Sequence, residues 1–194
     1  MKKFAALIAL AIASTGVAQA QAPAEDNGVR FFLGAGLTAG GDKLVKLEFT
    51  DGTDSTVTAG GLVQLTGGVD YRINSDFSLQ TSINYHVSDA TASDGSVKFT
   101  RMPIELIGYY NVTPEWRIGA GARYVSSAKL SASGNAGHGH VDFDNTVGAL
   151  VEAEYMFSPK AGVKFRYVAE KYKVSITKEK VDGNHFGAMF NYYF

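Results

Sequence analysis

The C-terminal segment of the chain repeats with a period of two residues. In an extended strand, one face would carry Phe186, Ala188, Phe190, Tyr192 and Phe194, because successive side chains of a strand point to opposite sides. A strand with one continuous apolar face has to place that face against a core or against lipid. This constraint limits what the chain can fold into more than any other feature of the sequence.

The same alternation recurs through most of the chain. One face of segment 77–87 is apolar or aromatic at most positions, and the other face is polar. Segments 116–124, 147–157 and 161–167 follow the same pattern. This periodicity predicts an all-β fold. The eight predicted strands lie near residues 29–39, 61–73, 77–88, 98–111, 116–127, 144–157, 160–172 and 184–194.

The connections between these strands alternate in length. The short turns lie at 74–76, 112–115 and 158–159, and the long segments lie at 40–60, 89–97, 128–143 and 173–183. This alternation is typical of an eight-stranded antiparallel up-and-down transmembrane β-barrel, with short periplasmic turns and long extracellular loops. Within the first long segment, Leu44, Leu47 and Phe49 followed by Asp51-Gly52 predict a hairpin that extends the first two strands.

A soluble exported barrel would show the same alternation, so insertion into a membrane needs separate support. The predicted lipid-facing sides carry no charge at mid-membrane, where a charge would cost roughly 2–4 kcal/mol. Aromatic side chains also collect near strand ends, as membrane interfaces require. These aromatic residues are Phe77, Tyr85, Tyr110, Trp116, Tyr124, Tyr155, Phe157, Tyr192 and Phe194. Both features favour the transmembrane barrel.

The N-terminus has the three parts of an export signal. Met1-Lys2-Lys3 is basic, residues 4–13 are apolar, and Val17-Ala18-Gln19-Ala20 supplies the small residues that precede a cleavage site. The apolar run is too short for a helix that crosses the roughly 30 Å hydrocarbon core. The expected division is a signal peptide at 1–20 with cleavage after Ala20, a short N-terminal extension at 21–28 and a barrel domain at 29–194.

Composition excludes several other classes of protein. No second segment approaches the roughly 18 apolar residues of a membrane-spanning helix. The chain has no cysteine, so an exported domain of this size has to be held by a large core or by a closed sheet. The net charge of −1 gives no electrostatic basis for binding nucleic acid.

The interior of an eight-stranded barrel is just wide enough for side chains. Charged residues on the inner face must therefore pair with one another, because a lone buried charge is costly. The short turns bring Glu152 and Glu154 opposite or diagonal to Lys164 and Arg166. They also bring Glu105 near Arg123, and they place Asp70 and Arg72 opposite Gln80 and Ser78. We predict a lumen charge network of Asp70, Arg72, Glu105, Arg117, Arg123, Glu152, Glu154, Lys164 and Arg166. The main interpretation is a polar plug, and the alternative is an ion-conducting path along the same residues.

Histidines are the remaining candidates for chemistry. His138 and His140 lie in a Gly-rich segment close to Asp142 and Asp144, and such a group could bind a metal ion. No cysteine or nearby third histidine completes a recognisable metal motif. We therefore predict no metal site and no cofactor. His185 is expected to line the lumen at the start of the last strand.

The pattern as a whole resembles the small outer-membrane β-barrel superfamily, which includes OmpA-, OmpX-, OmpW- and Opa-like barrels. The resemblance rests on the export signal, the segments 68–73 and 116–122, and the terminal Phe194. It implies a location in the outer membrane of a Gram-negative bacterium, with outer-membrane lipids around the barrel. We also expect a monomer. The resemblance also implies periplasmic chaperones and the barrel-assembly machinery as partners, with Tyr192 and Phe194 as the assembly signal.

One further spacing bears on enzymatic activity. His86 and Ser88 share a face at a strand end, and this spacing resembles the His-x-Ser arrangement of the lipid A deacylases, which are also eight-stranded barrels. Here Asp89 stands where that arrangement has asparagine, and the pair points to the lumen in the predicted register. We therefore expect no catalytic residue, and lipid A hydrolysis remains a remote alternative.

Two classes of function stay open. The first is an integral barrel with a filled lumen that acts in envelope integrity or in surface interaction through its extracellular loops. The second is a porin-like passive channel for small polar or hydrophobic solutes, with segment 40–60 at its entrance. The near balance of interior charges favours the first class, because it leaves little room for water.

Overall fold

The computed structural model describes residues 28–48, 54–91, 95–134 and 138–194. The predicted signal peptide and most of the N-terminal extension lie outside the described residues. The described part of the chain contains no helix that is long and apolar enough to cross a membrane.

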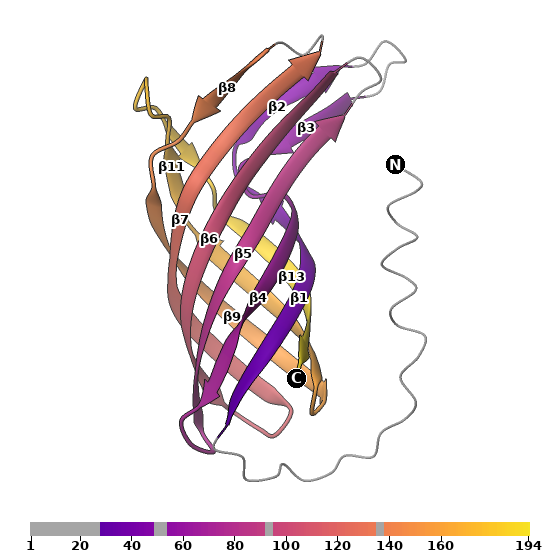
Figure 1. The fold of residues 1–194 in the computed structure, drawn as a ribbon, viewed down its shortest axis with the longest axis vertical. Coiled ribbons are helices and arrows are strands. Elements are labelled where there is room, and N and C mark those ends of the chain that lie inside the picture. Colours follow the sequence, from indigo (N-terminus) through magenta and orange to yellow (C-terminus); the bar gives the residue numbers. More distant parts are fainter. Residues whose placement is uncertain (1–27, 49–53, 92–94, 135–137) are drawn as a thin grey trace.

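Eight antiparallel strands form one closed barrel (Figure 1). Each strand pairs with its neighbour along the chain, and the first strand pairs with the last through Phe32↔Tyr193 and Leu37↔Ala188. This closure confirms the predicted fold. The barrel strands are β1 (Val29–Gly40), β4 (Leu62–Arg72), β5 (Phe77–Thr91), β6 (Gly95–Asn111), β7 (Trp116–Gly134), β9 (Thr146–Ser158), β10 (Ala161–Ala169) and β13 (His185–Tyr193).

The period-two pattern separates an apolar outer wall from a polar lumen. On β5, every residue from Phe77 to Tyr85 alternates between exposed and buried. The exposed residues include Phe77 and Ile83, whereas Ser78 and Gln80 are buried. Large apolar side chains that are exposed on the outer wall are stable in an apolar surrounding, and a lipid bilayer provides one.

Aromatic side chains border the apolar wall near the short turns. Phe77 packs on Tyr110 with ring centroids 5.4 Å apart, and Trp116 packs on Tyr155 at 5.0 Å. At the end of the chain, Tyr192 contacts Phe194 edge to face at 5.2 Å. These pairs lie where an aromatic belt marks the boundary between lipid and water.

Local hydrogen bonds explain why the short turns are short. The Asn74 side-chain oxygen accepts the backbone N–H groups of Asp76 and Phe77. The Thr113 hydroxyl accepts those of Glu115 and Trp116 in the same way. Asn and Thr favour turns for this reason.

The opposite end of the barrel differs from the sequence-based prediction. Segments 89–97 and 128–143 were expected to be loops, but strands β5, β6 and β7 continue through most of them, to Thr91, from Gly95 and to Gly134. Apolar residues on the inner side of these extensions make a core above the lumen, and this core makes continued pairing favourable. The predicted hairpin in 40–60 is present as paired strands β2 (Lys43–Glu48) and β3 (Asp54–Thr58), and its turn lies outside the described residues.

Three shorter strands complete this end. β8 (Gly139–Asp142) pairs with the extension of β7, and β11 (Lys171–Lys173) pairs with β12 (Lys180–Asp182). An isolated bridge between Phe143 and Val174 joins the residue directly after β8 to the residue directly after β11. We call the extensions of β5, β6 and β7 beyond the barrel, together with β2, β3, β8, β11 and β12, the platform. Figure 1 shows it beyond the end of the barrel that is opposite the short turns.

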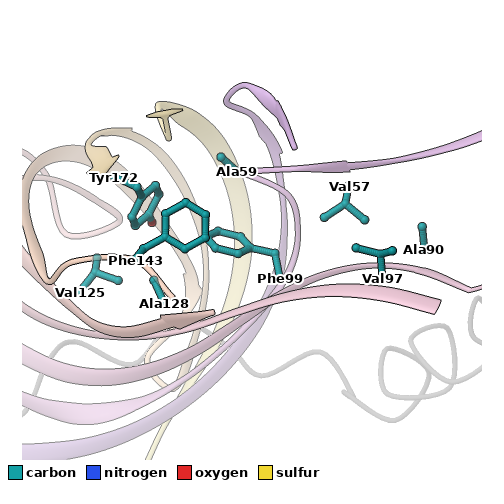
Figure 2. Close-up of a cluster of buried hydrophobic side chains, with 9 residues drawn as sticks. All are labelled: Val57, Ala59, Ala90, Val97, Phe99, Val125, Ala128, Phe143 and Tyr172. Carbon is teal, nitrogen blue, oxygen red and sulfur yellow. The ribbon is translucent and has the colours of Figure 1, made fainter. Parts of the chain in front are cut away.

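A cluster of buried apolar side chains that includes three aromatic rings packs at the platform end of the barrel (Figure 2). Phe99 meets Phe143 edge to face at 5.3 Å and Tyr172 at 5.6 Å. Burial raises the pKa of the Tyr172 hydroxyl, so this group stays protonated and donates a hydrogen bond to Glu170 at 2.5 Å. We call this cluster the cap. Its buried members are Val57, Ala59, Ala90, Val97, Phe99, Val125, Ala128, Phe143 and Tyr172.

The cap should contribute directly to stability. Phe99→Ala removes the ring that contacts both other aromatic residues, and we expect the free energy of unfolding to fall by about 3–5 kcal/mol. Reversible urea unfolding in phospholipid vesicles measures this change. Ile176→Ala is the control, because Ile176 is 88% exposed and should change stability by no more than about 0.5 kcal/mol. Equal effects of the two substitutions would contradict a packed cap.

Candidate functional site

The candidate site is the lumen, because charged side chains from six strands converge there. Alternation places them on the inner face, and the register of the strands places opposite charges side by side. Lys164 pairs with Glu154, Arg166 with Glu152, and Glu105 with Arg123 across neighbouring strands. All three pairings have the register that the short turns predict.

At the end near the short turns, Asp70 binds two guanidinium groups. Arg30 reaches it at 2.5 Å and Arg117 at 2.9 Å. Arg117 also pairs with Glu154 at 2.7 Å and donates to the Tyr193 hydroxyl. Its guanidinium lies 4.1 Å from the centroid of the Tyr109 ring. This stacking keeps the planar group fixed across the lumen.

Glycine makes room for that stacking. A Cβ atom at Gly119 would lie 2.7 Å from the Tyr109 ring. No larger residue fits there without moving the ring that supports Arg117.

In the middle of the lumen, Glu152 accepts two cations and a hydroxyl. Lys164 lies 2.8 Å from it and Arg166 lies 2.9 Å from it. The Tyr109 hydroxyl donates a hydrogen bond to the same carboxylate. Arg166 continues the network by pairing with Glu105 at 2.8 Å.

Toward the cap, Arg123 joins the network to the platform. It pairs with Glu105 at 2.9 Å and with Glu170 at 3.0 Å. Glu170 follows β10 and lies next to His185, whose Nδ1 is 3.6 Å from the carboxylate. The ion pairs therefore run without a break from Arg30 at one mouth to Glu170 under the cap.

Arg101 is a fully buried cation of a different kind. Among the described residues no carboxylate lies within ion-pair distance of it. Its guanidinium instead donates to the backbone carbonyls of Ala59 and Gly61 and contacts the His86 ring. The group also lies over the Phe99 ring at 4.9 Å. Arg101 thus fastens the base of the β2–β3 hairpin to the barrel wall.

The structure corrects one member of the predicted network. Arg72 has the expected register opposite Ser78, but it is half-buried at the mouth and makes no ion pair with any described residue. Arg30 takes its place, because Arg30 lies opposite Asp70 on the neighbouring strand. The sequence predicts pairs only across short turns. Because the connection between β1 and β4 is long, it gives no register for Arg30 and Asp70.

Arg30, Arg101 and Glu170 were missed by the sequence analysis. Arg101 lies four residues before Glu105 on the same strand, so both side chains point inward. Glu170 lies four residues after Arg166 and points inward for the same reason. Alternation along those strands could have found both. The remaining eight predicted members of the network all lie in the lumen, and they are Asp70, Glu105, Arg117, Arg123, Glu152, Glu154, Lys164 and Arg166.

The histidine candidates are accounted for by structural contacts. His86 Nε2 is hydrogen-bonded to the Thr38 hydroxyl at 2.7 Å, and Ser88 accepts the backbone N–H of Thr58. The two side chains therefore serve different neighbours and do not form a base–nucleophile pair. His185 lines the lumen as predicted.

His138 and His140 are the other histidine candidates, and the sequence predicts no metal site at them. In the described parts of the chain, no group of three histidine, aspartate or glutamate side chains could hold a metal ion. His140 instead lies 3.4 Å from Asp142 on the exposed surface.

The arrangement defines a small transmembrane β-barrel whose lumen is filled by paired charges and covered by an aromatic cap. The family model of the outer membrane protein beta-barrel domain matches residues 5–194. The chain belongs to this family and is an outer-membrane β-barrel protein of Gram-negative bacteria.

Solved structures agree with this assignment at the level of the fold. The chain is similar to Neisserial surface protein A, with a TM-score of 0.57 and 15% identity over 86% of this chain and 97% of that one. It is also similar to Ail, the attachment invasion locus protein of Yersinia pestis, with a TM-score of 0.50 and 11% identity over the same shares. No curated protein sequence matches the chain significantly.

The ion-pair network makes a quantitative prediction. Glu105→Gln leaves Arg123 and Arg166 each short of one carboxylate inside the barrel, and we expect the free energy of unfolding to fall by about 3–5 kcal/mol. Urea unfolding in vesicles measures it. Asp54→Asn is the control, because it removes the exposed Lys46–Asp54 pair at 3.1 Å, which is worth at most about 1 kcal/mol. A small effect of Glu105→Gln would show that water already screens the lumen.

Proposed function

We propose that the protein is a non-conducting barrel that holds the platform at the cell surface, and that it acts there through contacts made by the platform. The main support for this proposal is that two separate groups of side chains occupy the lumen. The ion pairs fill the membrane-spanning part, and the cap covers its outer end.

A channel through this lumen would have to break several contacts at once. Arg117 spans from Asp70 to Glu154, and Arg166 spans from Glu105 to Glu152. Removing one partner from a buried ion pair leaves an uncompensated charge, which costs several kcal/mol. A solute that passed would also have to displace the Phe99 and Tyr172 rings. These costs favour the closed barrel over the channel alternative.

The platform has the properties of a contact surface rather than of loose loops. Its strands are paired, its inner side packs on the cap, and Arg101 ties the β2–β3 hairpin to the wall. A surface that is ordered before it meets a partner loses less conformational entropy on binding. Envelope integrity and surface interaction both fit this arrangement. In both cases the platform, which lies outside the lipid, makes the functional contacts.

Single-channel recording tests the closed lumen. We expect the refolded mature protein to be silent in planar bilayers, because paired charges and the cap leave no continuous water path. Glu152→Gln should also stay silent, since Tyr109 and Arg166 still fill the space. Heat-dependent gel mobility verifies beforehand that each barrel is folded, and a general porin in the same bilayers is the positive control. Steady openings that change in Glu152→Gln would overturn the proposal in favour of a channel.

Labelling of single cysteines tests the position of the platform. The natural chain has no cysteine, so two single-cysteine variants give signals without background. Ile176→Cys lies in the connection between platform strands β11 and β12, and Ser75→Cys lies in a short turn. On intact cells we expect a membrane-impermeant maleimide to label Ile176→Cys fully and Ser75→Cys only after the outer membrane is permeabilised. The reverse result would place the platform in the periplasm and exclude a function at the surface.

A further inference from the structure

A hollow of about 410 Å³ lies on the outer wall of the barrel, apart from the lumen and the cap. It crosses strands β5, β6, β7 and β8. Its lining combines two cationic residues, an anion, three hydroxyl-bearing side chains and a thioether. The lining residues are Tyr85, Thr100, Arg101, Met102, Ser127, Lys129 and Asp142.

The hollow lies at the level where the outer wall changes from apolar to polar. On the short-turn side of it, the exposed residues of β6 are Ile104 and Leu106. On the platform side, the exposed residue of β6 is Lys98, which lies opposite Asp89 of β5. Such a change marks the boundary between hydrocarbon and headgroups, and a tyrosine such as Tyr85 is typical of that depth.

A β-bulge in β7 creates the hollow. Thr100 pairs with Lys129 but Met102 pairs with Ser126, so β7 contains one extra residue at this point. Ser127 lies in the left-handed region with φ 54°. The extra residue reverses the alternation of β7. Ala128 turns inward into the cap, and Lys129 turns outward to the hollow.

The side chains of the hollow suit a phosphate group. Arg101 is fully buried and donates inward to Ala59 and Gly61, so Lys129 is the exposed cation of the hollow. The contact of Lys129 Nζ with Asp142 is long, at 3.5 Å, and exposed. A pair of this kind contributes little, so an incoming phosphate can take over Lys129. Asp142 keeps a second neighbour in His140 at 3.4 Å. The hydroxyls of Thr100 and Ser127 have no hydrogen-bond partner among the described residues and are free to donate.

We propose that this hollow binds the phosphate headgroup of a lipid in the outer leaflet. Lys129 and the two hydroxyls hold the phosphate at headgroup depth, and the acyl chains run down the wall over Met102, Ile104 and Leu106. The apolar residues Met102, Ile104 and Leu106 begin directly at the hollow. A lipid can therefore contact the polar hollow with its phosphate and these residues with its acyl chains. A free phosphate ion would use only the polar part. This site goes beyond the proposed surface function and does not depend on it.

Methionine methyl NMR tests the site. Met102 lines the hollow, while Met156 lies near a short turn and Met189 is buried in the barrel, so the latter two report unspecific effects. The refolded protein, labelled with ¹³C-methyl methionine in phosphatidylcholine nanodiscs, is titrated with phosphatidic acid. We expect a saturable shift of the Met102 signal alone. Lys129→Gln should weaken the apparent affinity roughly tenfold, as for the loss of one charge-assisted contact.

Controls separate this site from general electrostatic attraction. Lys98→Gln removes an exposed lysine on the same outer wall, outside the hollow, and should leave the titration unchanged. Inorganic phosphate at the same concentration should shift Met102 at least tenfold less strongly than the lipid. A linear response, equal effects of Lys98→Gln and Lys129→Gln, or inorganic phosphate as effective as phosphatidic acid would each overturn the lipid site. An unchanged Met189 signal verifies that every variant keeps its fold.

Discussion

Closure of the sheet between β1 and β13 is the constraint on which the other features depend. A strand edge left open in lipid would expose unpaired N–H and C=O groups, each at a cost of several kcal/mol. Pairing from Phe32↔Tyr193 to Gly40↔His185 removes that edge. Closure around eight strands then fixes an interior just wide enough for side chains. Every inward residue therefore needs a partner within that narrow space.

The lumen shows how a chain can bury many charges by pairing them with one another. Most carboxylates there contact two cations, as Asp70 and Glu105 do, so no single pair bears the whole electrostatic cost. Aromatic residues support the network from the side, since Tyr109 contacts both Arg117 and Glu152. The network thus connects strands that are not neighbours in the sheet. It fixes their relative positions where backbone pairing alone acts only between adjacent strands.

Much of this arrangement could be predicted from the sequence, for a physical reason. Alternation decides which face a residue occupies, and a short turn decides which residue lies opposite, so the Lys164–Glu154 and Glu105–Arg123 pairings followed directly. Arg30 was missed because a long connection separates β1 from β4 and leaves the register open. The hairpin β2–β3 was predicted, but the extensions of β5, β6 and β7 and the short strands β8 and β12 were missed. Their polar and glycine-rich stretches resemble loops in the sequence, and they pair as strands because their inner side covers the cap. The bulge at Ser127 was invisible, since no residue there demands φ > 0.

The bulge at Ser127 shapes both the cap and the hollow on the outer wall. Without the extra residue, the inward parity of Arg117, Arg123 and Val125 would continue to Lys129 and place its amine against Phe99 and Phe143. With it, Ala128 and Leu130 complete the cap, and Lys129 faces the outside at headgroup depth. One inserted residue therefore both closes the lumen and puts a cation on the outer wall. A cap and a lipid contact that arise from the same backbone irregularity are hard to change separately, and this links the closed lumen to the position of the barrel in its membrane.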